Sequence, residues 1–226
     1  FMTMSETIEK HFNNSSIKVG VLSGPNLAKE IADEKVAGTV IASKHADLCH
    51  QAREILSSST FKIYTSDDIK GIELAGALKN IYAIISGYCH SLDVGENAIG
   101  LILTRSMAEM SNFAVNKGAN PITFLGLAGM GDLVATCFSK LSRNYQFGWA
   151  IGEGLDIEAA KYKVGQVAEG LNTIRIIHNE ISSSEIKMPL VSGMHEILFN
   201  SGSKELLLEQ IINSDIYVDV NFDVES

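Results

Sequence analysis

The sequence predicts an α/β segment followed by an all-helical segment, with the change at about Asp67–Asp68. Up to that point, short runs rich in β-branched residues alternate with runs that carry apolar residues at helical spacing. Beyond it, strand signals fade and long helical patterns take over. Alternating strands and helices are typical of a parallel or mixed sheet with crossover helices. We therefore expect an α/β domain over residues 1–67 and a helical domain over residues 68–226.

The elements of the α/β segment can be read in chain order. The first residues already have a helical pattern. Then come a strand, a helix, a strand, a helix and a strand, in IKVGVLSG, NLAKEIADE, GTVIAS, ADLCHQAREILSS and FKIYTS. Three strands are fewer than a doubly wound sheet normally has. The glycine-rich motif G-x-G-x-x-G, which binds a dinucleotide when it follows a strand, does not occur after any of these strands. The nearest stretch, GLAGMGD, is a poor match and lies between helical segments. A dinucleotide site would therefore have its phosphate-binding turn upstream of this chain.

The composition is that of an ordinary globular chain. The 226 residues are 46% hydrophobic and carry a net charge of −9 without a long basic run, which argues against a general nucleic-acid binder. No apolar run approaches the ~18 residues of a membrane helix, and the start lacks the order of a signal peptide. The three cysteines form no CxxC pair and have no metal-ligand spacing with the six histidines. We expect a cytoplasmic protein without a metal site, whose partner is a small molecule or a protein.

The helical segment contains an unusual lysine in GIELAGALKNIYAIISGYCHSL. The residues three and four positions from Lys79 are Ala75, Gly76, Tyr82 and Ala83, so none carries a negative charge. One interpretation is a side chain that lies along apolar surface and lifts its ammonium into water. The alternative is a catalytic lysine, because an amine buried away from carboxylates gives up its proton more easily near neutral pH.

Three polar stretches offer partners for a catalytic lysine, although each also has a plain structural interpretation. In GMGDLVATC, Asp132 begins a helix and is either its N-cap or a functional carboxylate. In the short polar loop SRN, Ser142 to Asn144, the planar fork of Arg143 suits a phosphate, but a loop arginine is often only solvated. In SGPNLAKE, a strand ends and a helix starts, which either directs backbone amides at a ligand or forms a simple turn.

Five stretches in this order, SGPNLAKEIA, GALKNIYAI, GLAGMGDLVATC, SRN and GQVAEG, resemble NAD(P)-dependent glycerol-3-phosphate dehydrogenase of the bacterial type. The similarity runs from about Met4 to about Leu207. It implies the C-terminal part of a Rossmann-type NAD(P)-binding domain, residues 1–67, followed by a helical substrate domain like the C-terminal domain of 6-phosphogluconate dehydrogenase, residues 68–226. The family's glycine-rich turn and a second lysine are missing, so the chain is similar to the C-terminal two thirds of such an enzyme.

The resemblance implies reversible hydride transfer between NAD or NADP and C2 of a three-carbon phosphate, which reduces dihydroxyacetone phosphate to sn-glycerol 3-phosphate for phospholipid synthesis. Lys79 matches the family's proton donor, Asp132 would hold and polarise it, and Asn80 and Thr136 would donate to substrate oxygens. The implied substrate-binding residues are Gly24, Asn26, Lys79, Asp132, Ser142, Arg143 and Asn144. The implied cofactor-binding residues are Ala28, Arg143, Val167 and Glu169. Asn26 stands where the family more often has Ser or Thr.

Two further expectations and two alternatives accompany this interpretation. We expect the isolated chain to bind NAD(P) poorly and to turn over slowly or not at all, and related enzymes are often homodimers. The first alternative is another dehydrogenase that pairs a Rossmann domain with a helical one, such as ketopantoate reductase. The second is a non-catalytic helical module for dimerisation or regulation.

Overall fold

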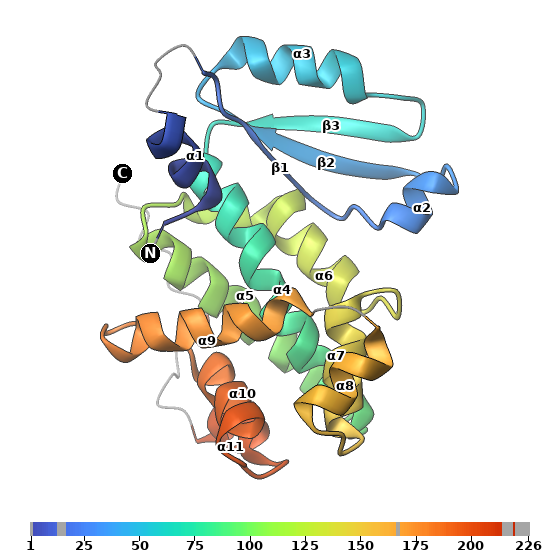
Figure 1. Ribbon diagram of the computed structural model, residues 1–226, viewed down its shortest axis with the longest axis vertical. Helices are drawn as coiled ribbons and strands as arrows, with labels where there is room; N and C mark the ends of the chain where they lie inside the picture. Colours follow the sequence, from blue (N-terminus) through green and yellow to red (C-terminus); the bar gives the residue numbers. More distant parts are fainter. Residues whose placement is uncertain (1, 13–16, 166–167, 214–218, 220–226) are drawn as a thin grey trace.

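A small sheet lies at one end of the molecule, and helices make up the rest (Figure 1). The structure is a computed structural model that describes residues 2–12, 17–165, 168–213 and 219. The expected order of α/β elements followed by helices is confirmed. The helix expected at the start of the chain is α1 (Met4–Phe12).

The sheet is mixed, with the strand order β1-β2-β3. Its strands are β1 (Val21–Ser23), β2 (Ala37–Ala42) and β3 (Phe61–Ser66). Between β2 and β3, α3 (Ala46–Leu56) returns the chain to the end of the sheet at which β2 begins, so the two strands are parallel. The connection from β1 to β2 contains only the short α2 (Ala28–Ala32) and does not cross back, so this pair is antiparallel.

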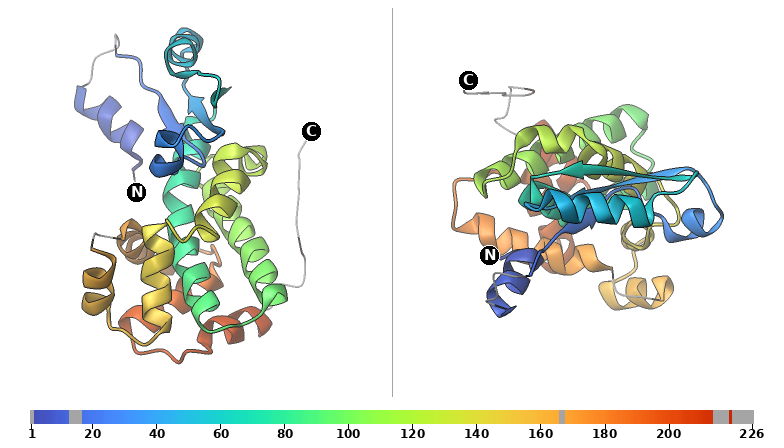
Figure 2. Two further views of the ribbon diagram at one scale, coloured as in Figure 1. Left: turned by 90° about the vertical axis from the view of Figure 1, so that its right-hand side faces the viewer. Right: turned by 90° about the horizontal axis from the view of Figure 1, so that it is seen from above.

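The sheet is covered on both faces, and alternate residues of β2 show this. Val40 and Ala42 pack on Ile72, in the helix that follows the sheet. Ile41 points the other way and packs on Cys49 of α3. Figure 2 shows α3 on one side of the sheet and the helical body on the other. The sheet is therefore held directly against the helices that carry the predicted site.

The helix α4 (Ile69–Ser91) runs through the middle of the helical body (Figure 2). Two residues separate it from β3, and the carboxylate of the second, Asp68, caps it by accepting a hydrogen bond from the backbone nitrogen of Gly71 across 2.9 Å. Most of its residues are buried, because neighbours surround it on several sides. The helices around α4 include α5 (Glu96–Asn116), α6 (Asp132–Cys137), α7 (Arg143–Gly152) and α9 (Glu169–Ser182).

Glycines allow α4 and α7 to approach closely. A Cβ on Gly148 would lie 1.8 Å from the carbonyl oxygen of Ile84, and one on Gly87 would lie 2.0 Å from that of Tyr145. Real carbon atoms cannot approach so closely, so the two backbones touch only because these positions lack side chains. The contact brings the start of α7 beside the middle of α4, where Lys79 lies.

The remaining elements complete the helical body. They are the 3₁₀ helix η1 (Pro121–Leu125), the π-helical turn η2 (Leu127–Gly131), α8 (Ile157–Val164), α10 (Pro189–Phe199) and α11 (Leu206–Ile212). One continuous apolar core joins most of these helices to α4. Among the described residues, none of the helices combines the length and the hydropathy needed to cross a membrane.

Candidate active site

A cavity of about 540 Å³ opens where β1 with its flanking residues, the first half of α4 and the first residue of α9 meet. Gly24, Asn26, Lys79, Asn80 and Glu169, all predicted site residues, line it. Residues of α1 form part of the wall. The fold thus gathers residues from four separate stretches of the sequence around one space.

The lysine of α4 is paired with a buried carboxylate. Nζ of Lys79 donates to Oδ2 of Asp132, which is only 2% exposed, whereas the lysine side chain is 19% exposed. Thr136 also donates from its hydroxyl to Oδ1 of Asp132 across 3.2 Å. Burial raises the pKa of Asp132, while Lys79, Thr136 and the backbone amide of Gly24 act in the opposite direction. The ammonium is therefore held at the cavity instead of extending into bulk water.

Asp132 is not the N-cap of its helix. It is the first residue of α6, Gly131 precedes it in helical conformation, and the Asp132 side chain makes no cap. The π-helical turn η2 leads directly into α6, which leaves the carboxylate to face Lys79. Gly129 makes this turn fit, because a Cβ there would lie 2.3 Å from the carbonyl oxygen of Phe124.

A chain of amide hydrogen bonds links the start of α9, the start of α7 and α4. The backbone nitrogen of Gly170 donates to Oδ1 of Asn144 across 3.0 Å. Nδ2 of Asn144 donates to Oδ1 of Asn80, also across 3.0 Å. Nδ2 of Asn80 then lies 3.5 Å from Oε2 of Glu169, at the cavity wall. Asn144 itself is buried, with 8% of its surface exposed.

The SRN stretch was expected to be a loop, and that expectation is wrong. Ser142 is the N-cap of α7, since its hydroxyl oxygen accepts a hydrogen bond from the backbone nitrogen of Tyr145 across 3.3 Å. Arg143 and Asn144 form the first turn of this helix. A serine cap satisfies a backbone donor that a helix start would otherwise leave without a partner, which is why the helix begins here. Arg143 lies at the positive end of the helix dipole, a favourable place for a phosphate.

Asn26 lines the cavity and has a buried side-chain oxygen to which no described residue donates a hydrogen bond. Its Nδ2 donates to Oγ1 of Thr39 across 2.8 Å, and that hydroxyl donates to the carbonyl oxygen of Ser23 across 3.0 Å. Because the single hydroxyl proton of Thr39 is used in this way, Thr39 must accept from Asn26, and Oδ1 of Asn26 is left buried without a hydrogen bond. Sequence reasoning missed Thr39, although a threonine among the apolar residues of GTVIAS was a usable signal.

Not every predicted residue lines the cavity. Ala28, Ser142 and Arg143 are absent from its wall. Asp132, Thr136 and Asn144 are absent too, but Asp132 bonds to Lys79, Thr136 to Asp132 and Asn144 to Asn80. Val167 lies outside the described residues. Sequence reasoning did not single out Glu73 and Gly76 as site residues, although they also line the cavity, about two turns and one turn before Lys79 on α4.

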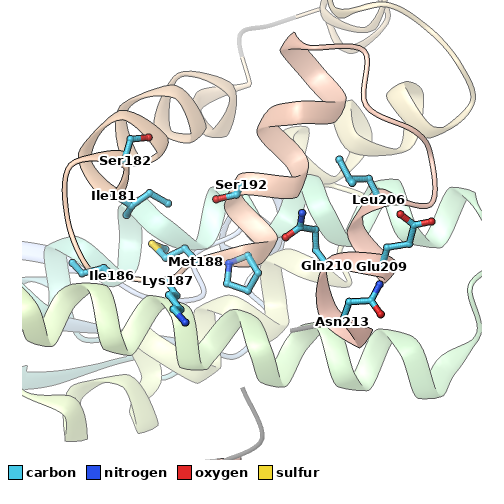
Figure 3. A pocket seen from close by; sticks show the side chains of 11 residues that line it. Ile181, Ser182, Ile186, Lys187, Met188, Ser192, Leu206, Glu209, Gln210 and Asn213 are labelled. Carbon is cyan, nitrogen blue, oxygen red and sulfur yellow. The ribbon is translucent and has the colours of Figure 1, made fainter. Parts of the chain in front are cut away.

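A second cavity of about 550 Å³ lies among α9, α10 and α11 (Figure 3), and α10 and α11 are at the end of the helical body opposite the sheet (Figure 1). Its wall comes from the end of α9, the segment before α10, α10 itself and α11, and includes Lys187, Ser192 and Gln210. None of the predicted site residues lines it. We therefore place the candidate active site in the cavity at Lys79.

One group among the described residues has side chains suited to a metal ion. Ligand atoms of His178, His195 and Glu196 all lie within 4.8 Å of one another. However, the two imidazole rings stack with centroids 3.7 Å apart and planes 5° apart. Their lone pairs lie in two parallel planes and do not converge on one point, so the group as it stands does not form a coordination site.

Comparison with known proteins gives consistent results. A protein-family model for the C-terminus of NAD-dependent glycerol-3-phosphate dehydrogenase matches residues 68–209, and the corresponding N-terminal model matches residues 1–49. Curated proteins called glycerol-3-phosphate dehydrogenase [NAD(P)+] from Pseudomonas putida and from Pseudomonas syringae pv. tomato are each 47% identical over 222 residues. These alignments cover 98% of this chain and 64% of each relative, so the chain spans less than two thirds of their length.

A solved structure has the same fold. The crystal structure of glycerol-3-phosphate dehydrogenase from Coxiella burnetii superimposes with a TM-score of 0.87 and 34% sequence identity. The match covers 92% of this chain and 63% of that chain. The expected combination of a Rossmann-type part and a helical part is thereby confirmed.

Proposed function

The chain belongs to the NAD-dependent glycerol-3-phosphate dehydrogenase family, and we propose that its function is the reversible reduction of dihydroxyacetone phosphate to sn-glycerol 3-phosphate with NAD(P)H. The observation that carries this proposal is the pair of Lys79 and the buried Asp132 at the cavity. A charged amine held in place by a carboxylate is a suitable proton donor for a ketone that is being reduced.

The cavity suits a small polar ligand. Its volume of about 540 Å³ lies within the roughly 300–1,000 Å³ of typical ligand sites. Asn26 lies in the cavity wall, beside the space that the ligand would occupy. The family resemblance assigns cofactor contacts to Ala28, Arg143, Val167 and Glu169, and Glu169 is in the cavity wall.

In the proposed mechanism, NAD(P)H would, when bound, supply the hydride for C2 of the ketone. The carbonyl oxygen then gains negative charge, and Nζ of Lys79 gives it the proton that completes the alcohol. Asp132 stays ionised and stabilises the ammonium before the transfer. Thr136 and the backbone of Gly24 hold Asp132 in place. A positioned acid of this kind contributes about 10²- to 10⁴-fold to the rate.

Other residues would bind and orient the substrate. Asn80 presents its amide nitrogen toward the cavity and can donate to a substrate oxygen. Arg143, at the start of α7, has the fork of donors that a phosphate group requires. Gly24 and Asn26 would contact the substrate from the edge of the sheet, and Ser142 would support the start of α7.

The proposed setting is the cytoplasm, where the product would supply phospholipid synthesis. Either NAD or NADP would serve as the cofactor. As in related enzymes, the protein would act as a homodimer.

The test is an assay of NADH or NADPH oxidation with dihydroxyacetone phosphate, using the full-length protein and its Lys79→Met variant. We expect turnover by the parent and a loss of at least about 10²-fold in the variant, because methionine keeps the apolar stem and removes the proton donor. Lys62→Met, at an exposed position on β3, is the matched control and should keep parental activity. Circular dichroism would establish that all three proteins are folded.

The alternatives give different results in the same assay. A folded parent that reduces ketopantoate but not dihydroxyacetone phosphate would replace the proposal with another dehydrogenase activity. A folded parent that reduces neither, and whose Tm does not rise with glycerol 3-phosphate, would favour a non-catalytic module. Full activity of Lys79→Met would remove the lysine from the mechanism.

A further inference from the structure

The helix α1 has little apolar attachment to the rest of the protein. Only Ser5 is buried among its nine residues, all of which the structure describes. Its apolar residues Met4 and Phe12 are 68% and 56% exposed, and the apolar cores formed by the described residues contain no residue of α1. In both views of Figure 2, α1 projects from the body of the molecule. Because a helix of this length is not stable by itself in water, polar contacts must hold it.

A carboxylate of α4 binds the first turn of α1. Oε1 of Glu73 accepts a hydrogen bond from the backbone nitrogen of Ser5 across 2.9 Å, and Oε2 accepts one from the Ser5 hydroxyl across 2.6 Å. Backbone N–H groups at the start of a helix have no partner within the helix, and the positive end of the helix dipole attracts negative charge. The Glu73 carboxylate satisfies both requirements, and hydrogen bonds to a carboxylate are stronger than those between neutral groups.

A second contact between α1 and α4 is weaker. Glu6 forms a capping box with Thr3, whose backbone nitrogen donates to Oε2 of Glu6 across 2.8 Å. The other carboxylate oxygen of Glu6 lies 2.8 Å from Nζ of Lys70 on α4. Both side chains of this ion pair are more than a third exposed, at 36% and 38%, so the pair adds little stability. The main link between α1 and α4 is therefore the contact of Glu73 with Ser5.

The helix that Glu73 holds is also part of the candidate active site. Met4, Ser5 and Ile8 of α1 line the cavity. Glu73 lies in the same wall, about two turns before Lys79 on α4.

We propose that Glu73 is a positioning residue that holds α1 in place as a wall of the substrate cavity. This inference rests on the proposed function and deepens it. Both carboxylate oxygens of Glu73 are bonded to Ser5, and a carboxylate repels a phosphate, so Glu73 acts through α1 and not by binding the substrate.

The decisive comparison is between Glu73→Ala and Glu73→Gln in the full-length protein. Alanine removes both acceptors, so we expect KM for dihydroxyacetone phosphate to rise about tenfold, with a smaller change in kcat because Lys79 stays in place. Glutamine keeps an acceptor for the backbone nitrogen of Ser5, and its amide can donate to the Ser5 hydroxyl, which also accepts. Its KM should therefore stay near the parental value. A lower KM in both variants would mean that Glu73 acts on the substrate through its charge, and would overturn the proposal.

A double-mutant cycle tests whether Glu73 acts through Ser5. Ser5→Ala loses one of the two hydrogen bonds and keeps the backbone donor, so its KM should rise less than that of Glu73→Ala. In a Glu73→Ala background, Ser5→Ala should have no further effect, because the contact is already lost. Effects that multiply would show two independent roles and would reject the inference. Glu9→Ala, at an exposed position on α1, is the control and should keep the parental KM.

Amide hydrogen exchange tests the attachment of α1 without any substrate. Peptides that cover α1 should exchange at least about tenfold faster in Glu73→Ala than in the parent, Glu73→Gln and Glu9→Ala, because a detached helix opens more often. Equal rates in all four proteins would reject the inference. Melting temperatures would establish that each protein is folded in the assay.

The result for the parent keeps the two proposals apart. Turnover of dihydroxyacetone phosphate by the parent, with an unchanged KM in Glu73→Ala, rejects the role of Glu73 alone. No turnover by a folded parent rejects the proposed function, and the exchange rates then decide whether Glu73 holds α1 at the cavity.

Discussion

The hydroxyl of Tyr82 donates to Oε2 of Glu109 across 3.0 Å inside the helical core. The other oxygen of Glu109 accepts from the backbone nitrogen of Leu190, at the start of α10, across 2.7 Å. The carboxyl group thus joins α4, α5 and α10, although Glu109 is only 5% exposed.

This contact predicts a pH-dependent stability. Burial raises the pKa of Glu109 from 4.5 to about 8. Between these values the native state keeps a proton that the unfolded state has lost. The stability that this proton contributes is complete below pH 4.5, and it disappears as the pH rises through about 8. We expect the Tm of the full-length protein to fall between pH 5 and pH 8.5, and Glu109→Gln to remove part of that fall. Equal slopes for the variant and for the exposed control Glu158→Gln would contradict the prediction.

The partner of Lys79 gives a second prediction. Asp132→Asn keeps the shape of the side chain and an acceptor for Thr136, but it removes the charge that balances the ammonium. We expect kcat to fall by about 10²-fold at saturating substrate, since the proton donor is no longer held in its reactive form. Asp47→Asn, at an exposed position paired with Lys18, is the control. Parental kcat in a folded Asp132→Asn protein would show that the carboxylate has no part in proton transfer.

The approach of α4 and α7 gives a third prediction. Gly148→Ala would place a Cβ 1.8 Å from the carbonyl oxygen of Ile84, so the helices must separate. Overpacking of this kind lowers the free energy of unfolding by about 1–3 kcal/mol. Activity should fall as well, because α7 carries Asn144. Gly100→Ala on α5 meets nothing within 4 Å and should be neutral or stabilising. Denaturant unfolding of both variants would test the contrast, and equal stabilities would contradict it.

Asn26 gives a fourth prediction, concerning substrate affinity. Asn26→Asp would place a carboxylate where the amide now donates to Thr39, beside the space assigned to an anionic substrate. We expect KM for dihydroxyacetone phosphate to rise at least about tenfold through charge repulsion. Asn26→Ser, the residue type more frequent in the family, should stay near the parental KM. A rise of the same size in both variants would show that the shape of the side chain matters and its charge does not.

The strands and long helices could be predicted because their signals are local. The alternation of β-rich and helical runs gave β1, α2, β2, α3 and β3 in order. The direction of β1 could not be predicted, since it depends on the route of the chain between two strands. The helix start at Ser142 was also missed, although a serine before a helical pattern is an N-cap signal that favours a helix over a loop.

The contacts within the site could not be predicted from local sequence patterns, because they join residues that are far apart in the chain. Lys79 and Asp132 are 53 positions apart, and no spacing rule relates them. The family resemblance named them together, but only the folded chain shows that a π-helical turn aims the carboxylate and that Gly24 also reaches it. The orientation of the Asn80 amide depends on three segments at once, so it cannot be read from any of them.

The uninterrupted course of α4 from the sheet to the core has a consequence for how the protein tolerates insertions. Lys79 and Asn80 lie on the helix that begins at Ile69, directly after its cap Asp68 and close to the last strand. One extra residue between Asp68 and Lys79 would turn everything beyond it by about 100° and shift it by about 1.5 Å. The sheet and the helical body, which carries both Lys79 and Asp132, could each survive such a change, yet the lysine would no longer face Gly24 and Asn26 across the cavity. The number of residues in this stretch is therefore under the same constraint as the identity of the lysine.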